Sequence, residues 1–98
     1  MIEIDLKDHD DMERFFFGPQ TDHDLIYGEI YGSIHKALDE GLDQVQFALI
    51  SLESGEQLDM VCHSQDYVEN LTNCLIYFEK AEAYEKCSAI QRLLKDLA

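Results

Sequence analysis

The stretch from Leu42 to Cys62 constrains the fold most, because its apolar residues alternate on both sides of a turn. Every second position of each arm is apolar: Val45, Phe47 and Leu49 in the first, and Leu58, Met60 and Cys62 in the second. Ser54 and Gly55 stand where a tight turn would fall, so the stretch predicts a β-hairpin. An isolated hairpin is marginally stable in water, so other elements must cover its apolar face. We expect that face to be formed by Phe47, Leu49, Leu58 and Met60.

The first twenty residues predict one strand and one short helix. Met1–Leu6 alternates apolar and acidic residues, which is typical of a half-buried strand, and we expect it at the edge of the hairpin. A short helix follows, with an aspartate cap at its start and Gly18 as its stop. The three consecutive phenylalanines at 15–17 cannot all face one side of a helix. One of them is therefore expected to remain exposed or to serve a partner.

The segment Thr21–Glu40 predicts a long helix, because apolar residues recur along one helical face. Thr21 or Asp22 is expected to cap it, and the glycine that follows is expected to end it. Gly28 and Gly32 lie inside this helix, where each glycine costs about 1 kcal/mol relative to alanine. Two explanations stay open: close packing against the sheet or another helix of the chain, and a close helix–helix contact in a dimer.

The chain after the hairpin predicts two more helices. Ser64 or Asp66 is expected to cap the first, in which Asp66 and Glu69 have capping-box spacing. A short connection, Lys80–Ala83, leads to a second apolar stripe that ends at Leu97, so we expect an antiparallel helix pair. The sequence thus predicts a single α+β domain over residues 1–98. In it, a small antiparallel sheet, made of the N-terminal strand and the hairpin, packs against the long helix and the C-terminal helix pair.

The last predicted helix has an ordered pattern of aromatic, small and aliphatic residues: Tyr84-Glu85, Cys87-Ser88, Ile90, Leu94 and Leu97. This pattern resembles the UVR motif, a helical hairpin of the UvrB and UvrC repair proteins and of some Clp-protease adaptors. The motif's Arg-Asp pair is absent, and Gln91-Arg92 stands there instead. The resemblance implies protein–protein docking rather than catalysis, although any stable helix hairpin can use the same pattern. The implied helix-pair interface comprises Tyr84, Cys87, Ile90 and Leu94.

Charge is the second strong feature of the sequence. The chain has 21 acids against 7 bases, a formal charge of −14, which repels nucleic acid and anionic membranes and attracts basic surfaces. No Lys or Arg lies between Lys36 and Lys80. The acids in that interval are Asp39, Glu40, Asp43, Glu53, Glu56, Asp59, Asp66, Glu69 and Glu79.

Other reactive side chains have simple structural explanations. The tripeptide Asp-His-Asp occurs at 8–10 and at 22–24 and could hold a divalent metal, but acids at a helix start also bind free backbone N–H groups. His63 with Ser64 and Asp66 supplies catalytic residue types without a nucleophile elbow. The three cysteines lie mostly on apolar stripes and lack a C-x-x-C pair, so we expect reduced thiols in a cytoplasmic protein. No metal, cofactor or enzymatic activity is expected.

The acidic run determines the expected function. Evenly placed carboxylates on a rigid body can imitate a phosphate backbone and occupy a nucleic-acid-binding groove. The chain is similar, in size and charge only, to small acidic phage inhibitors of host nucleases and polymerases. We expect a non-enzymatic inhibitor or regulator of a basic, nucleic-acid-binding protein. The alternatives are an acidic surface that is simply solvated, and an adaptor or homodimer built on the C-terminal helices. The expected partner-binding residues are Asp39, Glu40, Asp43, Glu53, Glu56, Asp59, Asp66 and Glu69.

Overall fold

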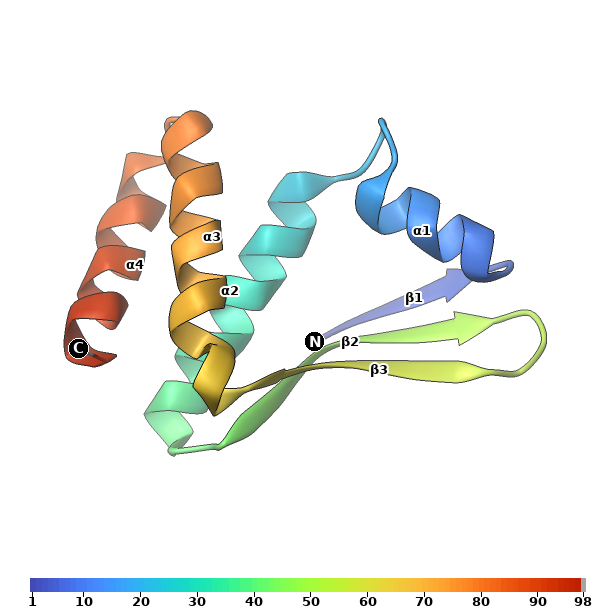
Figure 1. Cartoon of the computed structure of the whole chain (residues 1–98), viewed down its shortest axis with the longest axis horizontal. Helices are drawn as coiled ribbons and strands as arrows, with labels where there is room; N and C mark the ends of the chain where they lie inside the picture. Colours follow the sequence, from blue (N-terminus) through green and yellow to red (C-terminus); the bar gives the residue numbers. More distant parts are fainter. Residues whose placement is uncertain (98) are drawn as a thin grey trace.

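The computed structural model describes residues 1–97 and confirms the predicted α+β architecture. Figure 1 shows α1 and α2 over one side of a small sheet, with α3 and α4 beside α2 at the end away from the hairpin turn. The elements in chain order are β1 (Ile2–Leu6), α1 (His9–Phe17), α2 (His23–Glu40), β2 (Gln44–Leu52), β3 (Gln57–His63), the 3-10 helix η1 (Ser64–Asp66), α3 (Tyr67–Lys80) and α4 (Tyr84–Leu97).

The sheet has the order β1-β2-β3, so β2 is the central strand. β2 and β3 form the predicted antiparallel hairpin, with Gly55 in its turn at φ +94°. β1 lies at the edge, as predicted, but pairs with β2 in parallel, so the prediction of a wholly antiparallel sheet is wrong for this strand. The reason is connectivity: α1 and α2 carry the chain from the end of β1 back to the start of β2, which is the crossover that a parallel pair requires.

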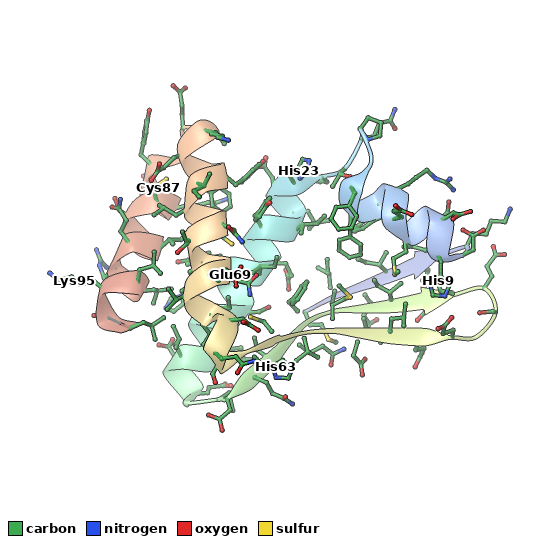
Figure 2. The ribbon with its side chains drawn as sticks, viewed as in Figure 1. His9, His23, His63, Glu69, Cys87 and Lys95 are labelled. Atoms are coloured by element: carbon green, nitrogen blue, oxygen red, sulfur yellow. The ribbon has the colours of Figure 1, made fainter. Side chains whose placement is uncertain are left out.

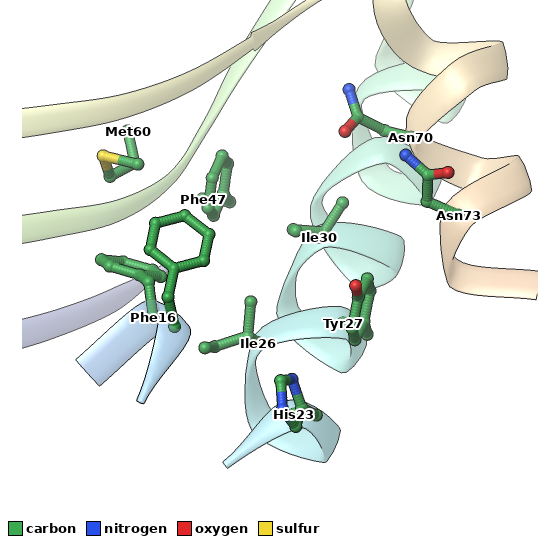
Figure 3. A pocket seen from close by; sticks show the side chains of 10 residues that line it. Phe16, His23, Ile26, Tyr27, Ile30, Phe47, Met60, Asn70 and Asn73 are labelled. Atoms are coloured by element: carbon green, nitrogen blue, oxygen red, sulfur yellow. The ribbon is translucent and has the colours of Figure 1, made fainter. Parts of the chain in front are cut away.

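A bulge in β2 shifts the side-chain alternation within that strand. Gln46 pairs with Val61, whereas Ala48 pairs with Met60, so Phe47 is one extra residue on β2. Figure 3 shows Phe47 and Met60 on the side of the sheet that faces the helices, as predicted. After an inserted residue, the next residues of the strand reverse their expected sides.

The reversal corrects one predicted core residue. Leu49 pairs with Asp59 on the far side of the sheet, so its predicted place in the apolar face is wrong. Figure 1 shows no helix among the described residues on that side, which we call the open face. The side that faces the helices carries Ile2, Ile4, Leu6, Ala48, Ile50, Leu52, Leu58 and Met60.

The first two helices begin at the predicted aspartate caps. The Asp8 carboxylate accepts a hydrogen bond from the backbone N–H of Asp11 (2.9 Å), and the Asp22 carboxylate accepts one from the N–H of Leu25 (3.0 Å). Gly41 ends α2 at φ +67°, a left-handed conformation that favours glycine. Local sequence signals thus determine where both helices begin and end.

The start of α3 differs from the prediction. One turn of 3-10 helix precedes it, and neither η1 nor α3 has a side-chain cap, so the predicted capping box between Asp66 and Glu69 is not formed. Instead, the Asn70 amide donates a hydrogen bond to the backbone carbonyl of Asp66 (2.9 Å). The chain therefore enters α3 through a 3-10 turn and not through a side-chain cap.

The main cluster of buried side chains lies in one part of the molecule. In what we call the helix half (α2, α3 and α4), buried side chains of all three helices meet. In what we call the sheet half (the three strands and α1), α1 has no buried residue at all, and Phe17 is 84% exposed. The expectation that one of the three phenylalanines stays exposed is therefore confirmed. The core cluster of the helix half, which also includes Cys62 of β3, is formed by Ile34, Ala37, Cys62, Tyr67, Leu71, Cys74, Phe78, Cys87 and Ile90.

The glycines of α2 are not explained by packing within the chain. A Cβ atom at Gly28 or at Gly32 would meet no heavy atom within 4 Å. Close packing against the sheet or another helix of the chain is therefore wrong as the explanation. A close contact between two copies of α2 stays a prediction.

Candidate functional site

The structure separates the eight expected partner-binding acids into two groups. The first, which we call the tip group, lies on the outer part of the hairpin and comprises Glu53, Glu56 and Asp59. The second, which we call the corner group, lies where α2 ends and α3 begins and comprises Asp39, Glu40, Asp43, Asp66 and Glu69. Figure 2 shows this separation: His9, which bonds Glu56, and His63, which precedes η1, lie at opposite ends of the hairpin. The eight acids therefore do not form one continuous face.

Hydrogen bonds hold the corner group together. The backbone N–H of Ser64 donates to the carbonyl of Asp43 (2.7 Å), and the Tyr67 hydroxyl donates to the carbonyl of Leu42 (3.0 Å). These bonds join the loop after α2 to the start of α3. Acids from the end of one helix thus lie near acids from the start of another. All members are exposed except Asp66, which is half-buried.

The negative charges of the tip group have few positively charged neighbours. Glu56 lies 2.9 Å from Nε2 of His9, and Asp59 accepts a hydrogen bond from the Gln46 amide (3.0 Å). In the corner group, His35 lies 3.7 Å from Asp39. Within residues 1–97, no Lys or Arg side chain forms an ion pair with any of the eight acids. Their negative charge is therefore available to a partner.

An apolar groove, which sequence reasoning missed, lies beside α1. Two cavities of about 290 and 570 Å³ both contact Phe16, Phe17 and Met60, so they are neighbours, and we call the two together the α1 groove. Figure 3 shows the part between the sheet, α2 and α3. The only sequence signal was the run of phenylalanines next to Met12. The groove is lined by His9, Met12, Glu13, Phe16, Phe17, His23, Ile26, Tyr27, Ile30, Phe47, Leu58, Asp59, Met60, Asn70 and Asn73.

The α2 side of the groove is held by an aromatic stack. The rings of Tyr27 and Tyr77 stack with centroids 4.7 Å apart, and His23 lies 6.2 Å from Tyr27. The Tyr77 hydroxyl donates a hydrogen bond to the Asp24 carboxylate, and this bond raises the pKa of Tyr77 to about 12. α2 and α3 are thus fixed to each other at the wall of the groove. α1, on the other wall, has no buried residue, and its His9 contacts Glu56 of the hairpin turn.

The two Asp-His-Asp segments act as helix starts. The first aspartate of each, Asp8 and Asp22, is the N-cap of its helix, so the structural explanation is confirmed. Within residues 1–97, no group of three or more His, Cys, Asp or Glu side chains is placed to hold a metal ion. The side chains of His63, Ser64 and Asp66 are not joined by hydrogen bonds in the described part of the chain.

The C-terminal helix pair agrees in part with the implied interface. Cys87 and Ile90 are buried in the seam and Leu94 packs against it, whereas Tyr84 is 66% exposed, so its expected place in the seam is wrong. Lys86 lies over the Phe78 ring instead, with Nζ 4.8 Å from the centroid, and closes that end of the seam.

The three cysteines are free and buried, as expected. Burial raises the pKa of the Cys74 thiol to about 12, and burial also raises the pKa of Cys62. Such thiols stay protonated near neutral pH and act as small apolar side chains. They therefore contribute to the core of the helix half.

The chain was compared with known proteins at the level of families, sequences and structures. No protein family, curated protein or solved structure matches it. The local resemblance of residues 83–97 to the UVR motif therefore stays a prediction. No helix in residues 1–97 has both the length and the apolar character needed to cross a bilayer.

Proposed function

We propose that this chain is a non-enzymatic binding protein that inhibits or regulates a basic, nucleic-acid-binding protein through its two acidic groups. The observation that supports this most is the run from Ala37 to Glu79, which contains nine acids and no Lys or Arg. All nine are exposed except Asp66. A partner with a basic groove would gain Coulombic attraction that no base within the run offsets.

The arrangement of the acids suits a partner that binds nucleic acid. The corner group is held on the packed helix half, and the tip group lies at the far end of the hairpin, in a molecule 42 Å long. Proteins that bind nucleic acid use Lys and Arg to neutralise phosphates along an extended path. Two separated groups of carboxylates on one body would engage such a path at two points and exclude the nucleic acid.

A competition assay tests this proposal directly. Purified basic proteins, for example a nonspecific nuclease, an RNA polymerase and a dimeric repressor, are bound to a fluorescein-labelled duplex, and the chain is titrated in. We expect the chain to displace the duplex from at least one of them. The apparent affinity should fall steeply as salt rises from 50 to 200 mM, because the attraction between exposed charges is screened.

Matched charge variants provide the control. The corner triple D39N/E40Q/D43N and the tip triple E53Q/E56Q/D59N each remove three charges, as does E82Q/E85Q/D96N on exposed positions of the last segment. We expect each of the first two to weaken displacement by about tenfold or more and the third by less than about twofold. Equal effects of all three triples, or displacement that is insensitive to salt, would contradict the proposal.

A second candidate function is an adaptor or self-associating module that uses the C-terminal helices. It is favoured by three exposed apolar side chains on this pair: Val68 (49%), Ile76 (47%) and Tyr84 (66%). Size-exclusion chromatography with light scattering distinguishes the two functions. A dimer that persists in high salt and is lost in Ile76→Asp supports this candidate, and a monomer at all salt concentrations removes the self-associating form.

A further inference from the structure

The outer edge of β3 has no partner in the described chain. β3 hydrogen-bonds to β2 on one side only, because the strand order is β1-β2-β3. Figure 1 shows neither a strand nor a helix along its other edge among residues 1–97. Such an edge presents a row of free backbone N–H and C=O groups. An extended segment can therefore add to the sheet there.

The α1 groove borders this strand. Leu58 and Met60 of β3 line it from below, and Phe16 and Phe17 of α1 line it from the side. Figure 3 shows Met60 pointing into the same space as Phe16 and Phe47. In an added strand, alternate side chains would enter this groove.

The other side chains of an added strand would lie on the open face of the sheet. On β3 that face carries Asp59 together with Val61 and His63, whereas the acids Glu3 and Asp5 lie on β1 at the opposite edge of the sheet, and the face carries no Lys or Arg. The lining of the groove likewise includes Glu13 and Asp59 but no Lys or Arg. An incoming strand would thus meet the apolar groove on one side and, on the other, a face without Lys or Arg whose carboxylate on β3 is Asp59.

We propose that the edge of β3 and the α1 groove together bind an extended basic segment in which apolar residues alternate with Lys or Arg. Its backbone adds a fourth strand beside β3. Its apolar residues enter the groove, and its basic residues lie over the open face near Asp59. This inference rests on the proposed function, since it names the kind of segment by which the basic partner is recognised.

Two other possibilities fit the structure less well. The free edge of β1 is adjacent to a cavity whose lining includes one strand residue, Leu6, and the Arg14–Asp11 ion pair, so it lacks the paired apolar strand side chains that Leu58 and Met60 provide at β3. A second copy of this chain would bring two molecules of charge −14 together. Binding at β1 would shift the amide signals of β1, and pairing of two copies would shift those of β3 with protein concentration alone. Both results differ from those expected for a basic strand at β3.

A synthetic heptapeptide tests the proposal, because β3 has 7 residues. The probe is acetyl-Lys-Leu-Lys-Phe-Lys-Leu-Lys-amide, added to the ¹⁵N-labelled full chain in 150 mM NaCl. We expect saturable shifts of the amide signals of β3 and α1, with those of α4 unchanged. Shifts spread over the acids of both groups without saturation, or shifts confined to β1, would overturn the proposal.

Backbone methylation of the probe tests the strand pairing without altering the protein. In a strand, the N–H groups of alternate residues point to opposite edges. One probe is N-methylated on its three apolar residues and another on its lysines. We expect one of the two to bind about tenfold or more weakly and the other to bind within about threefold of the parent. Equal affinities of the two isomers would overturn the pairing.

Side-chain variants test the two faces of the added strand. Phe17→Ala should weaken the probe about fivefold, because it removes a wall of the groove from an 84% exposed position. Asp59→Asn should weaken it about threefold and reduce the salt dependence. The matched controls Tyr84→Ala and Glu82→Gln, on α4 and in the turn before it, should change the affinity less than about twofold. A further probe has serine in place of each lysine. If it binds as tightly as the parent probe, the role of charge is overturned.

Failure of this inference can be told from failure of the proposed function. If the acidic triples abolish displacement of nucleic acid but Phe17→Ala leaves it unchanged, the strand site is wrong and the acidic binding function stands. If no basic protein is displaced while the heptapeptide binds at β3, the proposed function is wrong and the strand site stands. Shifts of β3 signals with protein concentration alone would assign the edge to a second copy and overturn the inference.

Discussion

The helix half and the sheet half use apolar residues in different ways. In the helix half, Phe78, Leu71 and Ile90 are at most 1% exposed and belong to one packed cluster. In the sheet half, α1 carries three adjacent phenylalanines, yet none is buried and one is 84% exposed. The helix half therefore holds the larger packed cluster, whereas the buried residues of the sheet half, such as Ala48 and Ile50, belong to the strands. The sheet half keeps apolar surface available, which in a monomer is typical of a site for a partner.

Each half carries one of the two acidic groups. The helix half anchors the corner group of acids through the bonds of Ser64 and Tyr67. The sheet half combines the tip group with the α1 groove and an unpaired strand edge. An acidic end on a packed core and an end that combines acids with an apolar groove suit the binding function proposed above.

The largest expected effect compares two phenylalanines. Phe78→Ala should lower the free energy of unfolding by about 3–5 kcal/mol, because it leaves a cavity in the packed helix half. Phe17→Ala should change it by less than about 0.5 kcal/mol, because that ring is exposed. Urea unfolding followed by circular dichroism measures both. A loss for Phe17→Ala comparable to that for Phe78→Ala would mean that α1 is part of the core.

Alkaline pH should destabilise the helix half next most strongly. Below pH 9 the Cys74 thiol is protonated in both states, but above it the unfolded thiol loses its proton while the native one, whose pKa is raised by burial to about 12, does not. The free energy of unfolding should therefore fall between pH 9 and pH 12, by roughly 1 kcal/mol per pH unit. In Cys74→Ala this fall should be shallower, and an identical pH profile in the variant would contradict the assignment.

Two glycine substitutions, one inside α2 and one at the residue that ends it, should change stability in opposite directions. Gly41→Ala should destabilise the protein by about 1–2 kcal/mol, because an L side chain is strained at the left-handed φ of +67°. Gly28→Ala should stabilise it by up to about 1 kcal/mol, because its Cβ meets nothing within 4 Å. Thermal unfolding distinguishes them. If the chain forms a dimer through α2, Gly28→Ala would instead lower stability in a concentration-dependent way.

Removal of the two aspartate caps, one at a time, should give the smallest difference in global stability between the two halves. Asp22→Ala should lower global stability by about 1 kcal/mol, because α2 is packed into the core. Asp8→Ala removes the same kind of hydrogen bond, but from a helix with no buried residue. It should increase amide exchange within α1 and leave the urea midpoint almost unchanged. Equal shifts of the urea midpoint would show that α1 unfolds together with the helix half.

The parts that the sequence predicted are those decided locally. The caps at Asp8 and Asp22, the stop at Gly41 and the hairpin turn at Gly55 each depend on a few neighbouring residues. The helix pair was also predictable, because apolar residues recur at helical spacing in both helices. These signals were sufficient for the α+β class.

The parts that could not be predicted depend on contacts between distant segments. The parallel direction of β1 follows from the path of α1 and α2, and no residue of β1 records it. The extra residue Phe47 reverses the sides of Leu49 and Ala48, although the sequence alternates without a break. The separation of the eight acids and the α1 groove arise only when the hairpin and helices are placed together. The sequence therefore indicated the sign of the partner's charge but not where the partner would bind.

Residue-resolved hydrogen exchange of the free protein tests the division into two halves most directly. We predict that the amides of Leu71, Cys74 and Ile90 exchange only by global unfolding, since all three residues are 0% exposed. Amides of α1, such as those of Phe16 and Phe17, should exchange through local opening at rates at least about a hundredfold higher. Equal protection of α1 and α3 would contradict the account, because it would make α1 a fixed part of the core rather than the movable wall of a binding groove.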